Sequence, residues 1–206
     1  MKEQATTQDL RLSELLILAC LWMIFGFMLW YYLSAFHGAP VRMLASKILS
    51  MILGNDFLNI IPNPDRHYLF QVQTNILFQF PDGSRENLGF IVNPLIFGFG
   101  LPLLFGLVMA SGVSFLRKLV ILLGGYVVVM LIQVWGVVWQ SLKMLSFNFG
   151  REASQVVANA GISNELIALC YQLGVLILPP LVPIILWVLA NWTLIEQFTG
   201  WQKEKG

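Results

Sequence analysis

Four long runs of apolar residues, separated by polar stretches, dominate this sequence of 206 residues. A helix needs about 20 mostly apolar residues to cross a bilayer. We therefore interpret the runs as transmembrane helices at residues 12–36, 94–115, 119–147 and 165–198. Charged residues make up 11% of the chain, against about 25% in soluble domains. The sequence predicts an all-α integral membrane protein with four transmembrane helices.

Net charge and cysteine position exclude several other classes of protein. The formal net charge of +1 excludes an electrostatic nucleic-acid binder. Cys20 and Cys170 fall inside apolar runs, which argues against a disulfide framework or a thiolate metal site. The first apolar run is too long for a signal peptide, and we interpret it as a retained anchor. We expect membrane lipid around the chain and no nucleic-acid partner.

The distribution of Lys and Arg predicts the orientation. With four spans, six of these residues fall on each side, so the bare count is a tie. Four of one set lie in the segment 37–93, which is long enough that charge stops controlling translocation. The short connections decide, above all the turn that contains Arg117 and Lys118. We expect both termini, residues 1–11 and 199–206, in the cytoplasm.

The segment 37–93 has the pattern of a small unit on the outer, periplasmic side. Apolar residues recur at three- and four-residue spacing over residues 40–53, which indicates an amphipathic helix on the membrane surface. Partial alternation around a turn predicts a β-hairpin over residues 68–92. Because a lone hairpin is marginal in water, it should rest on the amphipathic helix, the membrane surface or a partner protein. Residues 148–164 are expected to form a second periplasmic loop.

The polar residues inside the spans are neutral. No Asp, Glu, Lys, Arg or His falls centrally in a span, which argues against a pump or a proton-coupled carrier. The neutral groups either form interhelical hydrogen bonds or line a polar pocket at the outer face that receives a peptide or a partner helix. These groups are Asn93, Gln133, Gln140, Tyr171 and Gln172.

Helix-breaking residues gather in the second and fourth spans. Pro94 suits the first turn of a helix, where a missing amide proton costs little. Pro102 is expected in a helix interior, where it would kink the helix. Two kinked helices beside a straighter third would leave a wedge-shaped cavity, although kinks that serve packing alone remain an alternative. We assign structural roles to Pro94, Gly98, Gly100, Pro102, Gln133, Gly136, Pro179 and Pro183.

Nothing in the sequence has the pattern of an active site. Phosphate loops, hydrolase motifs and outer carboxylates at metal-ligand spacing are absent from the sequence. Cys170 with His37 or His67 is a minor alternative, an intramembrane cysteine enzyme, because buried cysteine is usually inert. We expect a protein that is not an enzyme and that has no metal and no cofactor.

Three sequence blocks together resemble a known family. Residues 93–102 read NPLIFGFGLP, residues 133–136 read QVWG, and residues 168–174 read ALCYQLG, followed by Pro179 and Pro183. In this order the blocks resemble the exosortase H-associated membrane proteins. The resemblance implies the inner membrane of a Gram-negative bacterium and an accessory role in handling surface proteins with a C-terminal sorting signal. Exosortases themselves resemble cysteine transpeptidases with a Cys, Arg and His set, whereas Cys170 has no intramembrane Arg or His beside it.

The leading hypothesis is a non-enzymatic inner-membrane accessory protein with a membrane-protein partner. It would bind exosortase, or the C-terminal sorting helix of its substrates, at the periplasmic face. The residues expected to contact the partner are Asn93, Gln140, Tyr171 and Gln172, with Phe78 and Phe80 in the hairpin. The alternative hypothesis is a small oligomeric membrane transporter or channel subunit, in which Gln133 and Gln140 line a pore.

Overall fold

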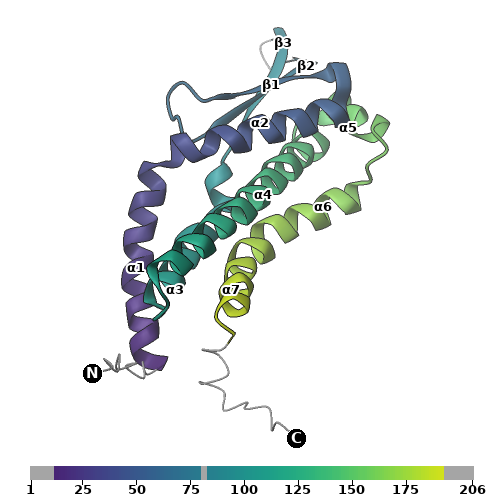
Figure 1. The fold of residues 1–206 in the computed structure, drawn as a ribbon. Coiled ribbons are helices and arrows are strands. Elements are labelled where there is room, and N and C mark those ends of the chain that lie inside the picture. The colour runs from purple at the N-terminus through teal and green to yellow at the C-terminus, as the bar shows by residue number, and fades with distance from the viewer. Residues whose placement is uncertain (1–11, 80–82, 193–206) are drawn as a thin grey trace, which may run out of the picture.

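The computed structural model describes residues 12–79 and 83–192. Most of them are helical, and a three-stranded antiparallel sheet joins the helices at one end (Figure 1). In chain order the elements are α1 (Leu12–Tyr32), α2 (Ser34–Leu53), the 3₁₀ turn η1 (Gly54–Asp56), β1 (Phe57–Pro62), β2 (Phe70–Gln79), β3 (Arg85–Val92), the 3₁₀ turn η2 (Pro94–Phe97), α3 (Gly100–Ala110), α4 (Phe115–Phe147), α5 (Gly150–Asn159), α6 (Asn164–Gln172), the π-helical turn η3 (Leu173–Ile177) and α7 (Leu178–Ala190).

The chain passes along the molecule four times (Figure 1). From the lower end of Figure 1, α1 runs up to α2, and η2 with α3 returns beside α1. α4 then crosses diagonally back toward the sheet, and α6, η3 and α7 descend again. The start of α1 and the end of α7 therefore lie at one end, which we call the base. α2, the sheet and α5 lie at the opposite end, which we call the cap.

Three of these passages have the length and composition of membrane spans. They are Ser13–Tyr32, Phe115–Phe147 and the continuous stretch Asn164–Ala190. In the remaining passage, the 3₁₀ turn η2 and the 11-residue helix α3 replace the single helix expected at 94–115. At 2.0 and 1.5 Å per residue these two elements extend about 25 Å, against about 30 Å for the hydrocarbon core. The fourth span stays a prediction.

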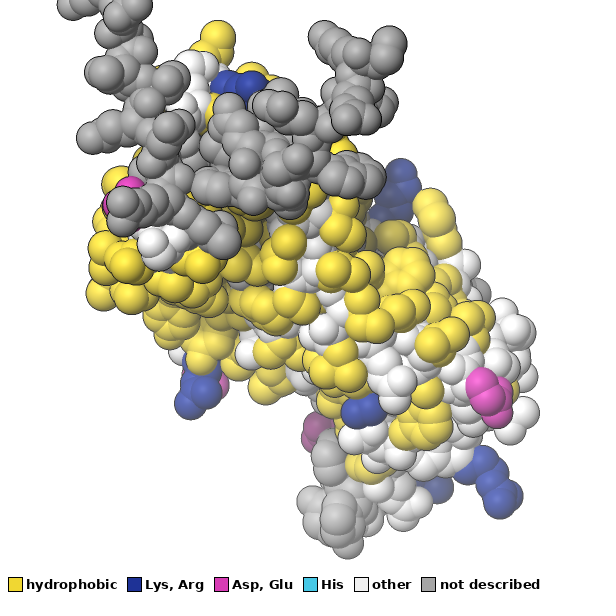
Figure 2. Space-filling model, turned by 90° about the horizontal axis from the view of Figure 1, so that it is seen from below, with side chains coloured by type: hydrophobic (Ala, Val, Ile, Leu, Met, Phe, Trp, Pro, Cys, Tyr) yellow, Lys and Arg dark blue, Asp and Glu magenta, His cyan; other side chains and the backbone are white. Residues whose placement is uncertain are grey.

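The flank of the helices is apolar, as a lipid environment requires. Seen from the base, hydrophobic side chains form a broad field, and charged side chains appear as scattered single groups (Figure 2). On α1, Ile17, Ile24 and Met28 are each more than half exposed. Such side chains are stable against lipid and not against water. The described helices therefore belong to a membrane protein.

The first span and the amphipathic helix meet at a corner (Figure 1). α1 ends at Tyr32, earlier than the expected residue 36, and α2 begins at Ser34 instead of residue 40. Only Leu33 separates the two helices, with a ψ of 3°. The helical pattern therefore continues through the corner. For this reason hydropathy alone places the boundary between the first span and the amphipathic helix too late in the sequence. Pro40 lies inside α2.

Pro102 does not kink a helix, contrary to the prediction from the sequence. It is the third residue of α3, because this helix begins at Gly100. Amides in the first turn have no intrahelical acceptor, so a proline there breaks no hydrogen bond. In the fourth span the helix is disturbed beside the proline run: the π-helical turn η3 ends two residues before Pro179, and Pro183 lies inside α7.

Small residues allow α1 and α3 to pack closely. Gly106 of α3 lies against the backbone carbonyl of Ala19, where a Cβ atom would overlap that oxygen. Gly26 of α1 lies over Pro102, and a Cβ at Gly26 would stand 3.4 Å from the Pro102 Cα. Small residues give membrane helices this close approach. The α1–α3 pair is therefore a tight two-helix unit.

Hydrogen bonds join the helix ends at the base. Trp187 Nε1 of α7 donates to Ser111 Oγ, after the end of α3, at 2.7 Å. Arg117 donates to the backbone carbonyl of Ala190 at 2.6 Å, and Lys118 donates to that of Met109 at 2.9 Å. Cations are stabilising at helix C-termini. The two cations that predict the orientation thus also cap α7 and α3.

The cap has a hydrophobic core of its own, shared with the upper half of α4. Every fourth residue of α2, from Val41 through Ala45 and Leu49 to Leu53, is buried. The sheet adds Phe57, Ile60, Phe70, Val72, Ile76, Leu88, Phe90 and Val92. Of the three supports considered for the hairpin, the sheet therefore uses the amphipathic helix, together with α4 and α5.

The sheet contains one strand more than expected. β2 and β3 form the hairpin, and β1 pairs with the other edge of β2, giving the order β1-β2-β3. In β1, Phe57 and Ile60 are buried with Leu58 and Asn59 exposed between them, because the register shifts between Phe57 and Asn59. A strand with such an irregularity lacks the period of two by which strands are recognised.

The segment expected as a loop at 148–164 contains the helix α5. Its buried residues Ala153 and Val157 are four apart and face the cap core. Phe149, just before α5, packs its ring against Phe78 and Phe90 of the sheet at centroid distances of 6.1 and 5.3 Å. Ala153, Val156 and Val157 recur at the three- and four-residue spacing of an amphipathic helix, a pattern that the expectation of a loop overlooked.

Candidate functional site

Asn93 and Gln133 fix the start of the second passage. Asn93 Oδ1 accepts a hydrogen bond from the amide of Leu95 at 3.0 Å and so caps η2. Gln133, which is 3% exposed, donates from Nε2 to the carbonyl oxygen of Pro94 at 3.3 Å. Both side chains are therefore engaged within the chain. The binding role assigned to Asn93 stays a prediction.

Glycines in α4 and around η2 allow the start of the second passage to pack closely against α4 and α7. The fully buried ring of Phe97 lies where a Cβ of Gly136 would be, and the Gln133 side chain lies where a Cβ of Gly98 would be. Gly100 similarly lies against the backbone carbonyl of Pro179, and a Cβ there would stand 2.6 Å from Pro183 Cγ. These residues hold the second, third and fourth passages together.

Gln140 belongs to α4, and Tyr171 lies near the end of α6, which packs against α4. Lys143 Nζ lies 5.1 Å from the centroid of the Tyr171 ring, a cation–π distance. Gln140 precedes Lys143 by one turn, and its Oε1 atom is buried without a hydrogen-bond partner. Gln172 is exposed. The structure thus places Gln140 and Tyr171 in one region. Asn93 lies at the start of η2, where its side chain accepts the hydrogen bond from Leu95.

Phe78 belongs to the cap core more than to a contact surface. Its ring meets Phe149 edge-on at an interplanar angle of 82°. Phe80 lies outside the described residues. A substitution of Phe78 would loosen the contact between the sheet and α5, so it is a poor probe for a partner.

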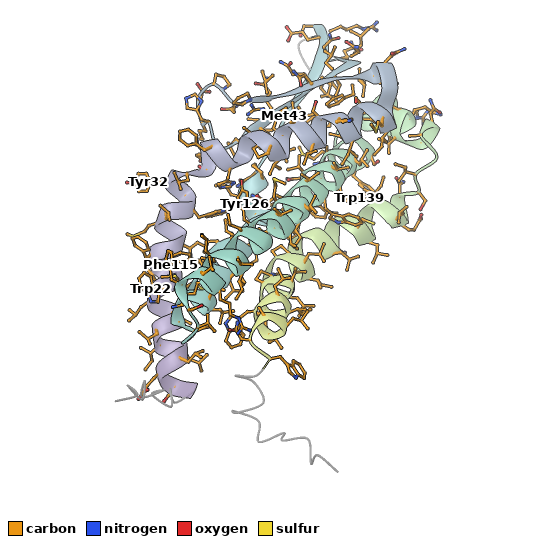
Figure 3. The ribbon with its side chains drawn as sticks, in the orientation of Figure 1. Trp22, Tyr32, Met43, Phe115, Tyr126 and Trp139 are labelled. Carbon is orange, nitrogen blue, oxygen red and sulfur yellow. The ribbon has the colours of Figure 1, made fainter. Side chains whose placement is uncertain are left out.

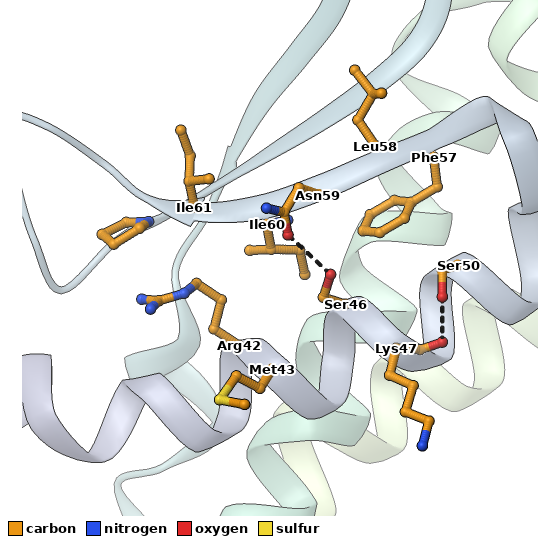
Figure 4. Close-up of a pocket in the computed structure, with 11 residues that line it drawn as sticks. Arg42, Met43, Ser46, Lys47, Ser50, Phe57, Leu58, Asn59, Ile60 and Ile61 are labelled. Carbon is orange, nitrogen blue, oxygen red and sulfur yellow. Dashed lines mark hydrogen bonds between the residues drawn. The ribbon is translucent and has the colours of Figure 1, made fainter.

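An open groove lies between α2 and β1 on the surface of the cap (Figure 4). Its volume is about 590 Å³, and its polar lining includes Arg42, Ser46, Lys47 and Asn59. Figure 4 shows the Arg42 guanidinium between the helix and the strand, on the side of Ile61, whereas Lys47 extends away from the strand. No Asp or Glu lines the groove. The α2–β1 groove therefore favours hydrogen-bond acceptors or anionic groups of a partner.

Hydrogen bonds fix the shape of the α2–β1 groove and block strand addition. Ser46 Oγ donates to Asn59 Oδ1 at 3.2 Å, which joins the helix to the strand, and the same oxygen accepts from the Ile60 amide at 2.8 Å. Pro62 has no amide hydrogen, so β1 offers few donors at its free edge. The groove is therefore suited to receive side chains and not a fourth strand.

A second cavity opens among the helices below the corner of α1 and α2. It has a volume of about 200 Å³ and takes walls from α1, α2, α3 and α4. Figure 3 shows Tyr126 of α4 below α2, on the side of this cavity. The lining residues are Gly26, Leu29, Trp30, Leu33, His37, Leu101, Pro102, Phe105 and Tyr126. We call this cavity the membrane recess.

Trp30 and His37 line the membrane recess at the corner between α1 and α2. Their rings stack at a centroid distance of 6.0 Å and an interplanar angle of 17°. Trp30 Nε1 and His37 Nε2 are both buried without a hydrogen-bond partner, a state that costs about 1–3 kcal/mol for each group. Burial lowers the pKa of His37 below its usual value of 6.5, although hydrogen bonds to the backbone carbonyls of Trp30 and His37 oppose this shift. His37 is therefore neutral at pH 7.

Sequence reasoning did not find either cavity. Arg42, Ser46 and Lys47 were visible as the polar face of the amphipathic helix, but the groove exists only because β1, which was not predicted, lies beside them. Trp30 and His37 stand seven residues apart in the sequence, without a pattern that pairs them. The corner between α1 and α2 is what brings their rings together.

The described residues show no metal cluster. Nowhere in residues 12–79 and 83–192 do three His, Cys, Asp or Glu side chains gather as ligands for an ion. The Cys170 side chain is buried, and its backbone carbonyl accepts a hydrogen bond from Trp135 Nε1 at 3.0 Å. Whether the protein is an enzyme stays a prediction from the sequence.

Comparison with known proteins gives one match. A family model described as exosortase H-associated membrane protein matches residues 9–194, which include every described helix and strand. No curated protein and no solved structure matches the chain.

Proposed function

We propose that this chain, which belongs to the exosortase H-associated membrane protein family, is a non-enzymatic accessory subunit that binds exosortase through its cap. The family match supports an association with exosortase, and the three long apolar helices support a common membrane. The α2–β1 groove is the observation that favours the cap as the contact surface. It is an open surface lined by a guanidinium, hydroxyl groups and amide groups, and its lining contains no carboxylate.

The construction of the cap supports this choice. Its core joins α2, the sheet, α4 and α5, so the walls of the groove are held in place before a partner arrives. A preformed surface loses less entropy on binding than a flexible one. On the orientation predicted by the short loops, the cap lies on the periplasmic side, where the sorting of surface proteins takes place.

The partner contact would be made by acceptor groups that meet Arg42 and the Ser46–Asn59 pair. Arginine binds carboxylates through paired hydrogen bonds, and its guanidinium lies between the helix and the strand (Figure 4). Leu58, which is 49% exposed, supplies an apolar contact beside these groups. The C-terminal sorting helix of a substrate is the other candidate partner for this surface.

Affinity purification from a host that produces exosortase tests the proposal. We expect the tagged wild-type chain in mild detergent to recover exosortase at near-equal amounts, and Arg42→Glu to reduce the recovered exosortase about tenfold or more, since a charged acceptor would then meet a carboxylate. Mass spectrometry identifies and quantifies the recovered protein. Recovery of a sorting-signal substrate without exosortase would transfer the proposal to the second partner.

Arg151→Glu is the matched control, because Arg151 is an exposed cation of α5 outside the groove. It should leave the recovery of exosortase unchanged. Equal recovery with all three chains would contradict the groove as the contact surface, and absence of exosortase from the wild-type sample would contradict the proposal as a whole. Thermal unfolding in detergent verifies that the variants are folded.

The transporter hypothesis receives no support from Gln133, one of the two glutamines that suggested it. Gln133 is buried and bonded to Pro94 within one chain, so its side chain is not available to line a pore between subunits. A symmetric oligomer after mild solubilisation would favour that hypothesis again. The enzyme alternative predicts that Cys170→Ala abolishes sorting, whereas our proposal expects sorting to continue.

A further inference from the structure

We propose that α2 rests one of its sides on the membrane leaflet next to the cap, with Lys47 bound to the phosphate group of a phospholipid. On the predicted orientation this is the outer leaflet. We call this side the leaflet face, and it consists of Leu44, Lys47, Ile48 and Met51. The inference is independent of the proposed contact with exosortase, which relies on Arg42 and on the hydrogen bond between Ser46 and Asn59.

The leaflet face is a different side of α2 from the one that packs in the cap core. Residues 44, 47, 48 and 51 recur at three- and four-residue spacing, so they lie on one side of the helix. Met51 is 72% exposed, and Leu44 and Ile48 are 39% and 38% exposed. The core side consists instead of Val41, Ala45, Leu49 and Leu53. An exposed apolar stripe of this kind is stable against lipid and not against water.

The position of His37 shows the direction in which the leaflet face points. His37 precedes Leu44 by seven residues in α2, so the two residues lie on the same side of this helix. The membrane recess, which His37 lines, takes its other walls from α1, α3 and α4. Lys47 agrees with this direction, because its side chain extends from α2 away from β1 (Figure 4). The leaflet face therefore points toward the level of the spans and not toward the sheet.

The start of α2 places the leaflet face at the membrane surface. Tyr31 and Tyr32, which end α1, are 53% and 84% exposed, and aromatic residues of this kind mark the membrane interface. Only Leu33 separates them from α2, which leaves the first span at a corner (Figure 1). Phe36, which is 79% exposed, lies in the first turn after this corner. The lipid-facing flank of α1 therefore continues into the exposed apolar surface of α2.

Lys47 selects a lipid headgroup as the neighbour of the leaflet face. The residues of α2 include no Asp or Glu, so the charge of the helix complements the phosphate layer of a membrane. Helices at a membrane interface bury their apolar side chains and extend their cations to the phosphates. An apolar helix of a partner protein would instead cover the ammonium group and leave its charge without solvation.

Spin labels on the full chain, in vesicles of phosphatidylethanolamine and phosphatidylglycerol, test the inference. The label is attached at Met51→Cys and, as the matched control, at Leu58→Cys, each combined with Cys20→Ala and Cys170→Ala. Both positions carry exposed apolar side chains of the cap, but Leu58 points from β1 away from α2 (Figure 4). We expect the ratio of collisions with oxygen, which dissolves in lipid, to collisions with a water-soluble nickel complex to be several-fold higher at Met51 than at Leu58.

Two outcomes of this comparison would overturn the inference. Equal ratios at the two positions would place the leaflet face in water. Magnetic coupling between labels at Met51 in different molecules would show that a second copy of the chain, and not lipid, covers this face.

Substitutions of Lys47 test the contact with phosphate through the label at Met51. Lys47→Glu should lower the oxygen-to-nickel ratio there, because a carboxylate is repelled by phosphate groups, and Lys47→Gln, which only removes the charge, should lower it less. Lys47→Arg keeps the charge and should keep the ratio. An unchanged ratio in both Lys47→Glu and Lys47→Gln would overturn the role of Lys47. Thermal unfolding and an unchanged ratio at Leu58 verify that each variant is folded.

Discussion

Gly136 shows how one missing side chain determines a contact between helices. The ring of Phe97 occupies the space that a Cβ at this position would need. Phe97 is fully buried, so it has no free space into which it can move. The docking of η2 on α4 therefore depends on glycine at this position.

We expect Gly136→Ala to lower the free energy of unfolding by about 1–3 kcal/mol, the usual cost of overpacking. Gly124→Ala is the matched control on the same helix, because no atom lies within 4 Å of the Cβ that it would add. The control should be neutral or slightly stabilising, since alanine is the better helix former. Denaturation of the purified protein in detergent measures both changes. Equal stability of the two variants would contradict the tight seat for Phe97.

Charged residues at the base have two roles that the sequence shows only in part. Arg117 and Lys118 lie in the first turn of α4, directly after the short connection from α3, which is why they predict a cytoplasmic base. In the structure each also donates to a carbonyl oxygen near the end of a helix, at 2.6 and 2.9 Å. Their position near the bilayer therefore follows from helix capping as well as from insertion.

At the scale of elements, α2 has two faces with different functions. Its buried face packs on the sheet and α4. Away from that face Met51 is 72% exposed, which fits a helix at the membrane interface, and Met43, 71% exposed, lines the α2–β1 groove. The periodicity of the sequence revealed the amphipathic helix, but it assigned the apolar face to the membrane, while the structure gives most of that face to the cap core.

We expect Leu49→Ala to destabilise the cap by about 2–5 kcal/mol, because it leaves a cavity in a packed core. Met51→Ala, on the exposed face, should change the stability little. Hydrogen exchange of β2 and β3, which rest on this core, measures the effect: Leu49→Ala should speed the exchange of these strands. Similar exchange in both variants would mean that α2 does not support the sheet.

Irregular elements mark the limits of sequence analysis. The second and fourth passages carry the prolines that the sequence analysis noted, but only the fourth is disturbed within the helix, at η3. In the second, the chain begins α3 just before Pro102. Where a helix starts relative to a proline depends on tertiary packing, here of Phe97 and Gly100 against α4 and α7.

At the scale of the whole molecule, four passages place the cap and the base at opposite ends (Figure 1). If all four passages cross the membrane, the cap and the base lie on opposite sides of it, and the cations of the short loops predict a periplasmic cap. Asn159 at the end of α5 and Ser114 before α4 are exposed residues at these two ends.

We expect a cysteine at Asn159 to react with an impermeant maleimide in cells with a permeabilised outer membrane, and a cysteine at Ser114 to react only after lysis. Both variants carry Cys20→Ala and Cys170→Ala, so the new thiol is the sole target. Mass spectrometry or gel shift measures the labelling. The reverse pattern would contradict the predicted orientation, and labelling of both sites before lysis would contradict a crossing by α4, the span that separates them.

The sequence by itself determined that the chain is a membrane protein, where its long apolar helices lie, and which family it belongs to. Whether a segment is stable in the hydrocarbon core of a membrane depends on its own composition, which can be read along the chain. The third strand, α5, the corner at Leu33, the α2–β1 groove and the membrane recess were decided only by the tertiary structure. Each of them depends on contacts between residues that are not neighbours in the sequence, such as Ser46 with Asn59 or Gly26 with Pro102, and local periodicity carries no record of such contacts.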